Sequence, residues 1–120
     1  MRIIIAGGRD FANTGMAFRC LKSLVKAGDV IISGHASGAD TIGELYAQKN
    51  GLSCELYPAD WKKYGKAAGP IRNEEMAKTA DILIAFWDGK SRGTKSMIEL
   101  SKKHGCQVFV FDYYGNERLV

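Results

Sequence analysis

The sequence DILIAFW at residues 81–87 runs directly into DGKSRGT at residues 88–94, and this junction guides the interpretation of the whole chain. The apolar run 82–86 is continuous, which is typical of a strand that is covered on both faces of a sheet. The next seven residues hold two glycines, two cations and two hydroxyls before a helical pattern begins. Because a simple turn needs fewer polar groups, the pattern favours a loop that holds an anion; the alternative is a long turn with a capped helix.

Similar apolar segments recur along the chain and alternate with helical patterns. The predicted strands are residues 3–6, 30–33, 54–57, 82–86 and 108–111, and the predicted helices are residues 16–26, 41–50, 72–79 and 94–104. This alternation predicts a parallel sheet with right-handed crossovers and helices on both faces. The expected fold is therefore α/β: a single Rossmann-like three-layer domain over residues 1–120, with a five-stranded sheet in the order 3-2-1-4-5.

The composition is that of a globular domain that needs no external support. Of the 120 residues, 46% are hydrophobic, which is enough to build a core. Cys20, Cys54 and Cys106 form no C-x-x-C pair and are odd in number, so neither a disulfide framework nor a zinc site is predicted. The longest apolar run has six residues, against about 20 for a membrane span, and no signal peptide is visible. We therefore expect a cytoplasmic protein without membrane contact.

The charged residues indicate an anionic ligand rather than a polyanionic partner. The net charge of +4 comes from 17 basic and 13 acidic residues. The cations are scattered and form no basic run, so we do not expect nucleic acid as a partner. Solvated helix faces account equally well for most of the lysines.

The glycines are distributed unevenly between the two edges of the predicted sheet. Eight of the 14 fall in loops that follow strands, at the edge where open α/β sheets bind ligands. Structural alternatives exist, such as a surface pair between Arg9 and Asp10 or a helix cap from Ser37. The residues of these loops that we predict to hold phosphate or ribose are Gly7, Gly8, Arg9 and Asp10 after the first strand, Ser33, Gly34, His35, Ser37, Gly38 and Asp40 after the second, and Asp88, Gly89, Ser91, Arg92, Gly93 and Thr94 after the fourth.

A longer signature supports a family resemblance. The segment ADWKKYGKAAGPIRNEEM at residues 59–76, with GGRDF at 7–11 and RGT at 92–94, resembles the YspA or cpYpsA-related branch of the SLOG superfamily. The resemblance covers nearly the whole chain and implies a Rossmann-like fold and a nucleotide-like ligand. Within the segment, Arg72 and Asn73 are expected to contact an anion. Trp61 is expected either to stack on a base or to plug a long loop.

Two departures from the superfamily patterns bear on activity. LOG-type phosphoribohydrolases carry Pro-Gly-Gly-x-Gly-Thr-x-x-Glu, whereas the residue three positions after Thr94 is Met97, and Glu99 follows two positions later. Arg72 stands at the counterpart of their catalytic arginine. In the second loop, His35 and Ser37 replace a glycine and an arginine that relatives often carry. The first departure puts glycosidic hydrolysis in doubt, because such hydrolysis usually needs an acid or base.

Three functions are therefore considered. The leading hypothesis is a sensor or sequestering protein that binds a nucleotide, or an ADP-ribose-like or cyclic derivative, through the glycine-rich loops. The first alternative is hydrolysis of a nucleoside monophosphate, with a carboxylate from Asp10, Asp88 or Glu99. The second is single-stranded DNA binding of the Smf/DprA type. We assign no catalytic residue, metal or cofactor, and we expect a nucleotide-like small molecule as ligand and a homo-oligomer.

Overall fold

The computed structural model describes all of residues 1–120 and contains one six-stranded sheet in the order β3-β2-β1-β4-β5-β6. The strands are β1 (Arg2–Gly7), β2 (Val30–Ser33), β3 (Ser53–Leu56), β4 (Ile82–Phe86), β5 (Gln107–Phe111) and β6 (Glu117–Arg118). The first five are parallel, and β6 pairs antiparallel with β5. The predicted α/β class and the order of the first five strands are confirmed, and the strand count is corrected from five to six.

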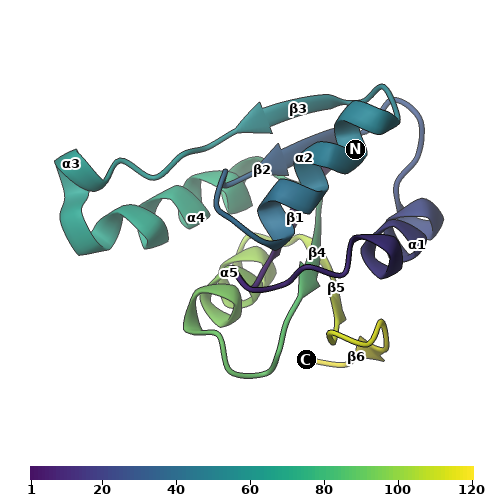
Figure 1. Cartoon of the computed structure of the whole chain (residues 1–120). Helices are drawn as coiled ribbons and strands as arrows, with labels where there is room; N and C mark the ends of the chain where they lie inside the picture. Colours follow the sequence, from purple (N-terminus) through teal and green to yellow (C-terminus); the bar gives the residue numbers. More distant parts are fainter.

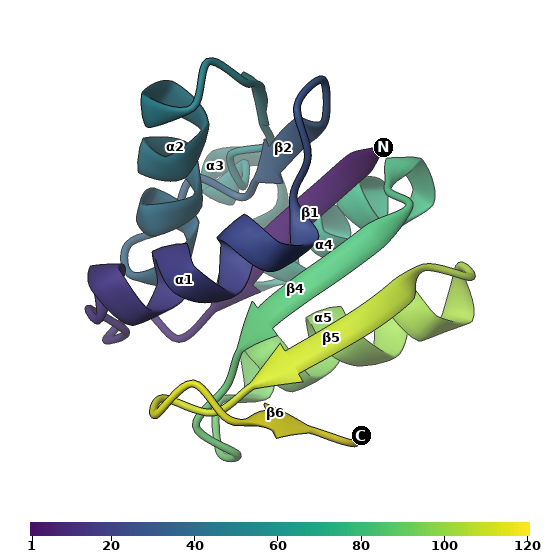
Figure 2. The same cartoon turned by 90° about the vertical axis from the view of Figure 1, so that its right-hand side faces the viewer.

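Helices cover both faces of the sheet (Figure 1). They are α1 (Thr14–Leu24), α2 (Ala39–Lys49), α3 (Trp61–Tyr64), α4 (Ala68–Thr79) and α5 (Arg92–Lys103), with a short 3₁₀ helix, η1 (Gly65–Ala67). Buried residues of α1 and α2 belong to one apolar cluster, and those of α4 and α5 belong to the other. Figure 2 shows the two pairs of helices on opposite sides of the sheet. The three-layer arrangement follows from these two clusters.

Strand β1 shows how the continuous apolar runs serve both cores. Successive side chains of a strand point to opposite faces. Ile3 and Ile5 accordingly pack in the cluster under α1 and α2, whereas Ile4 and Ala6 pack under α4 and α5. On the first of these faces the fully buried ring of Phe86 stacks on Phe11, with ring centroids 4.7 Å apart. This stack holds the loop after β1 against the end of β4.

Three short elements were not predicted from the sequence. Helix α3 and η1 have no apolar periodicity, and β6 has only two residues. Helix α4 begins at Ala68, four positions before the predicted start, because Pro70 lies in its first turn, where a missing N–H group costs no helical hydrogen bond. None of the helices is long and apolar enough to cross a bilayer.

The aromatic stack generates a stability prediction. Phe86→Ala should reduce the free energy of unfolding by about 3–5 kcal/mol, because it leaves a cavity between Phe11 and Phe111, whose rings both stack on Phe86. Urea denaturation followed by circular dichroism measures the loss. Leu56→Ala on the exposed edge strand is the control and should change stability by no more than about 0.5 kcal/mol. A Phe86→Ala loss close to that of the control contradicts the prediction.

Candidate anion-binding cleft

The carboxyl ends of β1 and β4 lie side by side at the centre of the sheet. Gly7 of β1 pairs with Phe86 of β4, and the helices that follow these strands, α1 and α5, lie on opposite faces. A crevice opens at such a switch point because the two connections diverge. A cleft of about 460 Å³ is present there, and we call it the central cleft. Its lining residues are Ala6, Gly7, Gly8, Arg9, Asp10, Ala36, Asp40, Arg72, Asn73, Met76, Ser91, Gly93, Thr94 and Met97.

The loop after β1 rests directly on the start of α2. Gly38 has a φ of +77°, and a Cβ atom at this position would lie 2.2 Å from the carbonyl oxygen of Gly8. The N–H group of Ala39 donates to the same oxygen at 3.3 Å. Only glycine at position 38 permits this approach without strain. Gly38 therefore supports the cleft from behind rather than lining it.

The N-terminus of α5 presents unpaired backbone donors to the central cleft. Ser91 is the N-cap, and its hydroxyl oxygen accepts from the N–H group of Thr94 at 3.4 Å. The N–H groups of Arg92 and Gly93 donate to no protein group. Such free donors, together with the helix dipole, favour an anion near the helix start. Gly93 lines the cleft, so its free N–H group borders it, whereas Arg92 lies outside the lining.

Asp88 shapes this loop from outside the cleft. Its carboxylate accepts from the N–H groups of Ser91 and Lys90, both at 2.8 Å. Both hydrogen bonds lower the pKa of Asp88, and the bond from Ser91 has the larger effect. Asp88 and the neighbouring Gly89 line a different cavity, on the side of β5 and β6. The carboxylate therefore acts as a turn residue in this structure.

Two arginines provide the positive charge of the central cleft. Arg72 of α4 is half-buried, and its Nη1 donates to the carbonyl oxygens of Gly34 and Tyr57. Its Nε donates to the side-chain oxygen of Asn73 at 2.9 Å. Burial lowers the pKa of Arg72, and the positive charge of Arg9 lowers it further. Arg9 itself is exposed and makes no hydrogen bond or ion pair, so the predicted alternative of a pair with Asp10 is not present.

Asp40 is the buried carboxyl group of the cleft. Desolvation raises its pKa to about 6, although the N–H group of Ala36 and the charge of Arg72 act in the opposite direction. The Ala36 N–H group donates to its Oδ2 at 3.3 Å. Asp40 therefore changes charge near pH 6, and it does so on the wall of a cleft that two arginines border.

Asp10 is held by a residue that the sequence did not point to. The hydroxyl of Tyr113, in the loop between β5 and β6, donates to Asp10 Oδ1 at 2.7 Å. Burial raises the pKa of Tyr113, and the hydrogen bond to Asp10 adds to this effect. A Cβ atom at Gly8 would lie 1.8 Å from the same hydroxyl, so the approach requires glycine there. The partners are 103 positions apart in the sequence, and no local pattern connects them.

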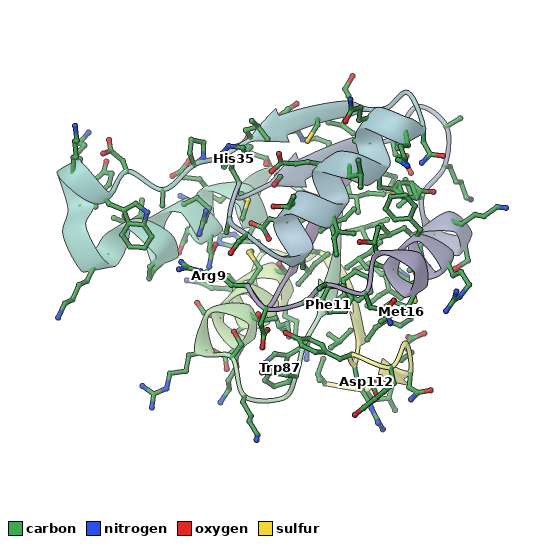
Figure 3. All side chains as sticks on the ribbon, in the orientation of Figure 1. Arg9, Phe11, Met16, His35, Trp87 and Asp112 are labelled. Atoms are coloured by element: carbon green, nitrogen blue, oxygen red, sulfur yellow. The ribbon has the colours of Figure 1, made fainter.

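A second, smaller cavity adjoins the central cleft, and we call it the side pocket. Its volume is about 260 Å³, and it shares Arg9, Ala36 and Arg72 with the central cleft. Trp61 of α3 and His35 of the loop after β2 are both part of its lining. Figure 3 shows Arg9 and His35 on the side of the molecule that carries α3 and α4. The full lining is Arg9, Gly34, His35, Ala36, Ser37, Pro58, Ala59, Trp61 and Arg72.

Most of the predicted ligand residues are brought together by the fold. Those in the central cleft are Gly7, Gly8, Arg9, Asp10, Asp40, Arg72, Asn73, Ser91, Gly93 and Thr94. Those that line only the side pocket are Gly34, His35, Ser37 and Trp61. Those outside both are Ser33, Gly38, Asp88, Gly89 and Arg92. Met76 and Met97 were not predicted, because a methionine at helical spacing is indistinguishable from a core residue in the sequence.

Ser33 and His35 were predicted to contact a ligand, but both side chains contact Glu44 instead. The Ser33 side chain is fully buried and donates to Glu44 Oε2 at 2.7 Å. His35 Nδ1 lies 3.0 Å from the same carboxylate oxygen. Glu44 on α2 therefore organises this loop, and it was not among the predicted residues. Neither Ser37 nor Asp40 caps α2, since the cap residue is Gly38 and no side chain bonds there.

The comparisons with known proteins identify the family. The model of the YspA, cpYpsA-related SLOG family matches residues 1–64. The chain is also similar to Gene 61 protein of Mycobacterium phage D29, with 34% identity over 119 residues that cover 92% of this chain and 95% of that protein. The chain belongs to the YspA, cpYpsA-related SLOG family. The expected family resemblance is thereby confirmed.

Solved structures similar to this SLOG domain are DNA processing proteins. DNA processing protein A (DprA) from Streptococcus pneumoniae matches with a TM-score of 0.70 and 20% sequence identity. The match covers 92% of this chain and 50% of the DprA chain. DprA from Helicobacter pylori matches with a TM-score of 0.72 and 23% sequence identity, and the match covers 99% of this chain and 66% of the DprA chain. That structure is described as showing a single-stranded DNA binding mode. At these identities the likeness establishes the Rossmann-like fold.

The DprA likeness also corrects one expectation. Because the cations are scattered and the net charge is small, we did not expect nucleic acid as a partner. That expectation is wrong. A protein with the same fold, the DprA of Helicobacter pylori, is described as binding single-stranded DNA. Net charge alone therefore does not exclude a nucleic-acid partner, because the local distribution of charge also determines the potential at a binding surface.

Asp40 generates a prediction about pH. Its pKa in the folded state, about 6, lies above the ordinary value of 3.8, so the stability that it contributes is full below about pH 4 and is lost as the pH rises through about 6. Asp40→Asn mimics the protonated form and removes this dependence. Between about pH 4 and pH 8 the variant should gain roughly 1–3 kcal/mol of unfolding free energy relative to the wild type, measured by urea denaturation. A difference that is constant across this range contradicts the burial argument.

Proposed function

We propose that this SLOG domain binds a nucleotide or a nucleotide-derived small molecule, such as an ADP-ribose-like or cyclic nucleotide, at the carboxyl edge of its sheet, and acts as a sensor or sequestering protein. The observation that carries this proposal is the convergence of two unlike anion-attracting features on one cleft. Arg9 and Arg72 supply charge, and the unpaired N–H group of Gly93 at the start of α5 supplies a backbone donor. Their combination is suited to phosphate, which accepts both charged and backbone hydrogen bonds.

The carboxyl groups of the cleft form no ion pair with Arg9. Asp10 and Asp40 match the formal charge of the two arginines when both are ionised. The Asp10 carboxylate, however, accepts from Tyr113 rather than from an arginine, and Asp40 loses its charge as the pH falls through about 6. Arg9 has no partner at all. An incoming phosphate therefore meets an unpaired guanidinium rather than a neutralised one.

Binding is favoured over glycosidic hydrolysis at this cleft. Met97 forms part of the wall and stands at the position of the glutamate of LOG-type enzymes. Glu99 is exposed and does not line the cleft, and the Asp88 carboxylate is engaged by the loop amides. Of the three carboxylates proposed for hydrolysis, only Asp10 borders the cleft. Chromatographic measurement of free base after incubation with nucleoside monophosphates tests this preference, and multiple turnover would overturn it.

Arg9→Ala should weaken the binding of nucleoside monophosphates and diphosphates by about tenfold or more, as measured by isothermal titration calorimetry, because a charged hydrogen bond contributes about 1.5–3 kcal/mol. Arg9 is exposed and unbonded, so its removal should leave the fold intact. Arg19→Ala on α1 removes the same charge from an exposed site outside the cleft and is the matched control. An equal loss in both variants, or no binding by the wild type, contradicts the proposal.

A second candidate function is single-stranded DNA binding, which the likeness to Helicobacter pylori DprA favours. A strand would place one of its phosphates between Arg9 and Arg72. Affinity for a fluorescent oligonucleotide, measured by anisotropy, should then fall steeply with salt, and Arg9→Ala should reduce the slope of log affinity against log salt by about one. Absence of binding at low salt removes this candidate and leaves the small-molecule proposal standing.

A further inference from the structure

The two arginines stand at the boundary between two cavities rather than at the end of one. Arg9 and Arg72 line both the central cleft and the side pocket. Arg72 is fixed in this place, because its Nη1 donates to the carbonyl oxygen of Gly34, a residue of the side pocket, and to that of Tyr57. No hydrogen bond engages its Nη2. An anion held by this pair therefore has open space on two sides.

The side pocket has the wall that a flat ring requires. Trp61 is 52% exposed. A Cβ atom at Gly69 would lie 3.6 Å from the far edge of the indole, so the ring rests over the first turn of α4. Gly69 and Arg72 are three positions apart on that helix and share one face. The indole of Trp61 therefore lies beside Gly69, about one turn of α4 before Arg72, and both Trp61 and Arg72 line the side pocket.

The central cleft accepts a different group. It is larger, about 460 Å³ against about 260 Å³, and it is bordered by the free N–H group of Gly93 and by the hydroxyls of Ser91 and Thr94. Such donors and acceptors are suited to ribose hydroxyls or to a further phosphate. The side pocket, apart from the two arginines and His35, has no charged lining residue. The two cavities therefore differ in chemistry, with the cation pair between them.

We infer that the ligand carries its phosphate internally, between two nucleoside-sized groups, with one group in the central cleft and the other against Trp61. The inference rests on the proposed function. A nucleoside monophosphate, whose phosphate is terminal, can fill only one of the two cavities while its phosphate lies between Arg9 and Arg72. A phosphodiester or diphosphate with a group on each side fills both.

This ligand chemistry could come from a free dinucleotide or from a strand of single-stranded DNA. Both contain an internal phosphate flanked by sugars and bases. They differ in length, and a strand continues beyond the two cavities. The inference concerns the internal phosphate that both sources share, and a comparison of ligands of different length separates the two sources.

The first measurement compares ligands on the unmodified protein. Adenosine 5′-monophosphate and the phosphodiester-linked diadenosine ApA are titrated by calorimetry under the same conditions. ApA should bind at least about fivefold more tightly, because base stacking on an aromatic side chain typically contributes 1–3 kcal/mol. A short oligodeoxyadenylate that binds more tightly than ApA identifies a strand as the source, and one that binds no more tightly identifies a free dinucleotide.

The second measurement uses variants of α3. Trp61→Ala should reduce ApA affinity to that of adenosine 5′-monophosphate while leaving the latter unchanged, and Trp61→Phe should restore most of the difference. Tyr64→Ala is the matched control, since Tyr64 is an exposed aromatic residue of the same helix that lines neither cavity. Circular dichroism verifies that each variant is folded, and the ligand comparison on the wild type remains decisive if one is not.

The outcomes distinguish a failure of this inference from a failure of the proposed function on which it rests. If adenosine 5′-monophosphate binds, Arg9→Ala weakens it and ApA binds no better, the ligand does not extend past the arginines and the inference is overturned. Equal losses in Trp61→Ala and Tyr64→Ala overturn it as well. If neither ligand binds, the proposed function itself fails.

Discussion

The parallel pairing of β1 with β4 is the constraint on which the rest of the structure depends. It brings together two strands that are separated by most of the chain and whose following helices lie on opposite faces of the sheet. The loops that start at Gly7 and Phe86 therefore diverge, and the space between them is not filled by a connection. The apolar runs of both strands make this pairing favourable, because each contributes side chains to two cores. The position of the central cleft is thus a consequence of hydrophobic burial, while its polarity comes from the loops.

The fold was largely predictable because continuous apolar runs and helical spacing are signals that local sequence carries. The short helix α3 was missed because four residues, WKKY, show no periodicity, and β6 was missed for the same reason. In the candidate cleft, Arg72 and the loop after β1 could be predicted from residue type and from their position after a strand or at the start of a helix. The bond between Tyr113 and Asp10 could not, because its partners meet only through the sheet order. The raised pKa of Asp40 likewise depends on burial, which sequence position alone does not give.

Several predicted residues support the cleft rather than border it. Gly38 permits the contact with Gly8, Ser33 is bonded to Glu44, and Asp88 holds the loop before α5. In each case the residue type expected for a ligand contact is the type that a tight loop also requires. Glycine, serine and aspartate serve both purposes, so composition indicated loops that lie at the cleft without distinguishing the two roles. The correction on nucleic acid has a related cause, since net charge describes the whole surface and not the few cations at one edge.

The hydrogen bond between Tyr113 and Asp10 has a consequence for the order in which the molecule is built. Asp10 leaves the ribosome long before Tyr113, since 103 positions separate them. During synthesis the loop after β1 therefore lacks the hydroxyl that packs against Gly8 and holds the neighbouring carboxylate. A nascent chain that contains β1, β2 and their helices but not yet Tyr113 therefore lacks one of the contacts that hold this rim of the sheet.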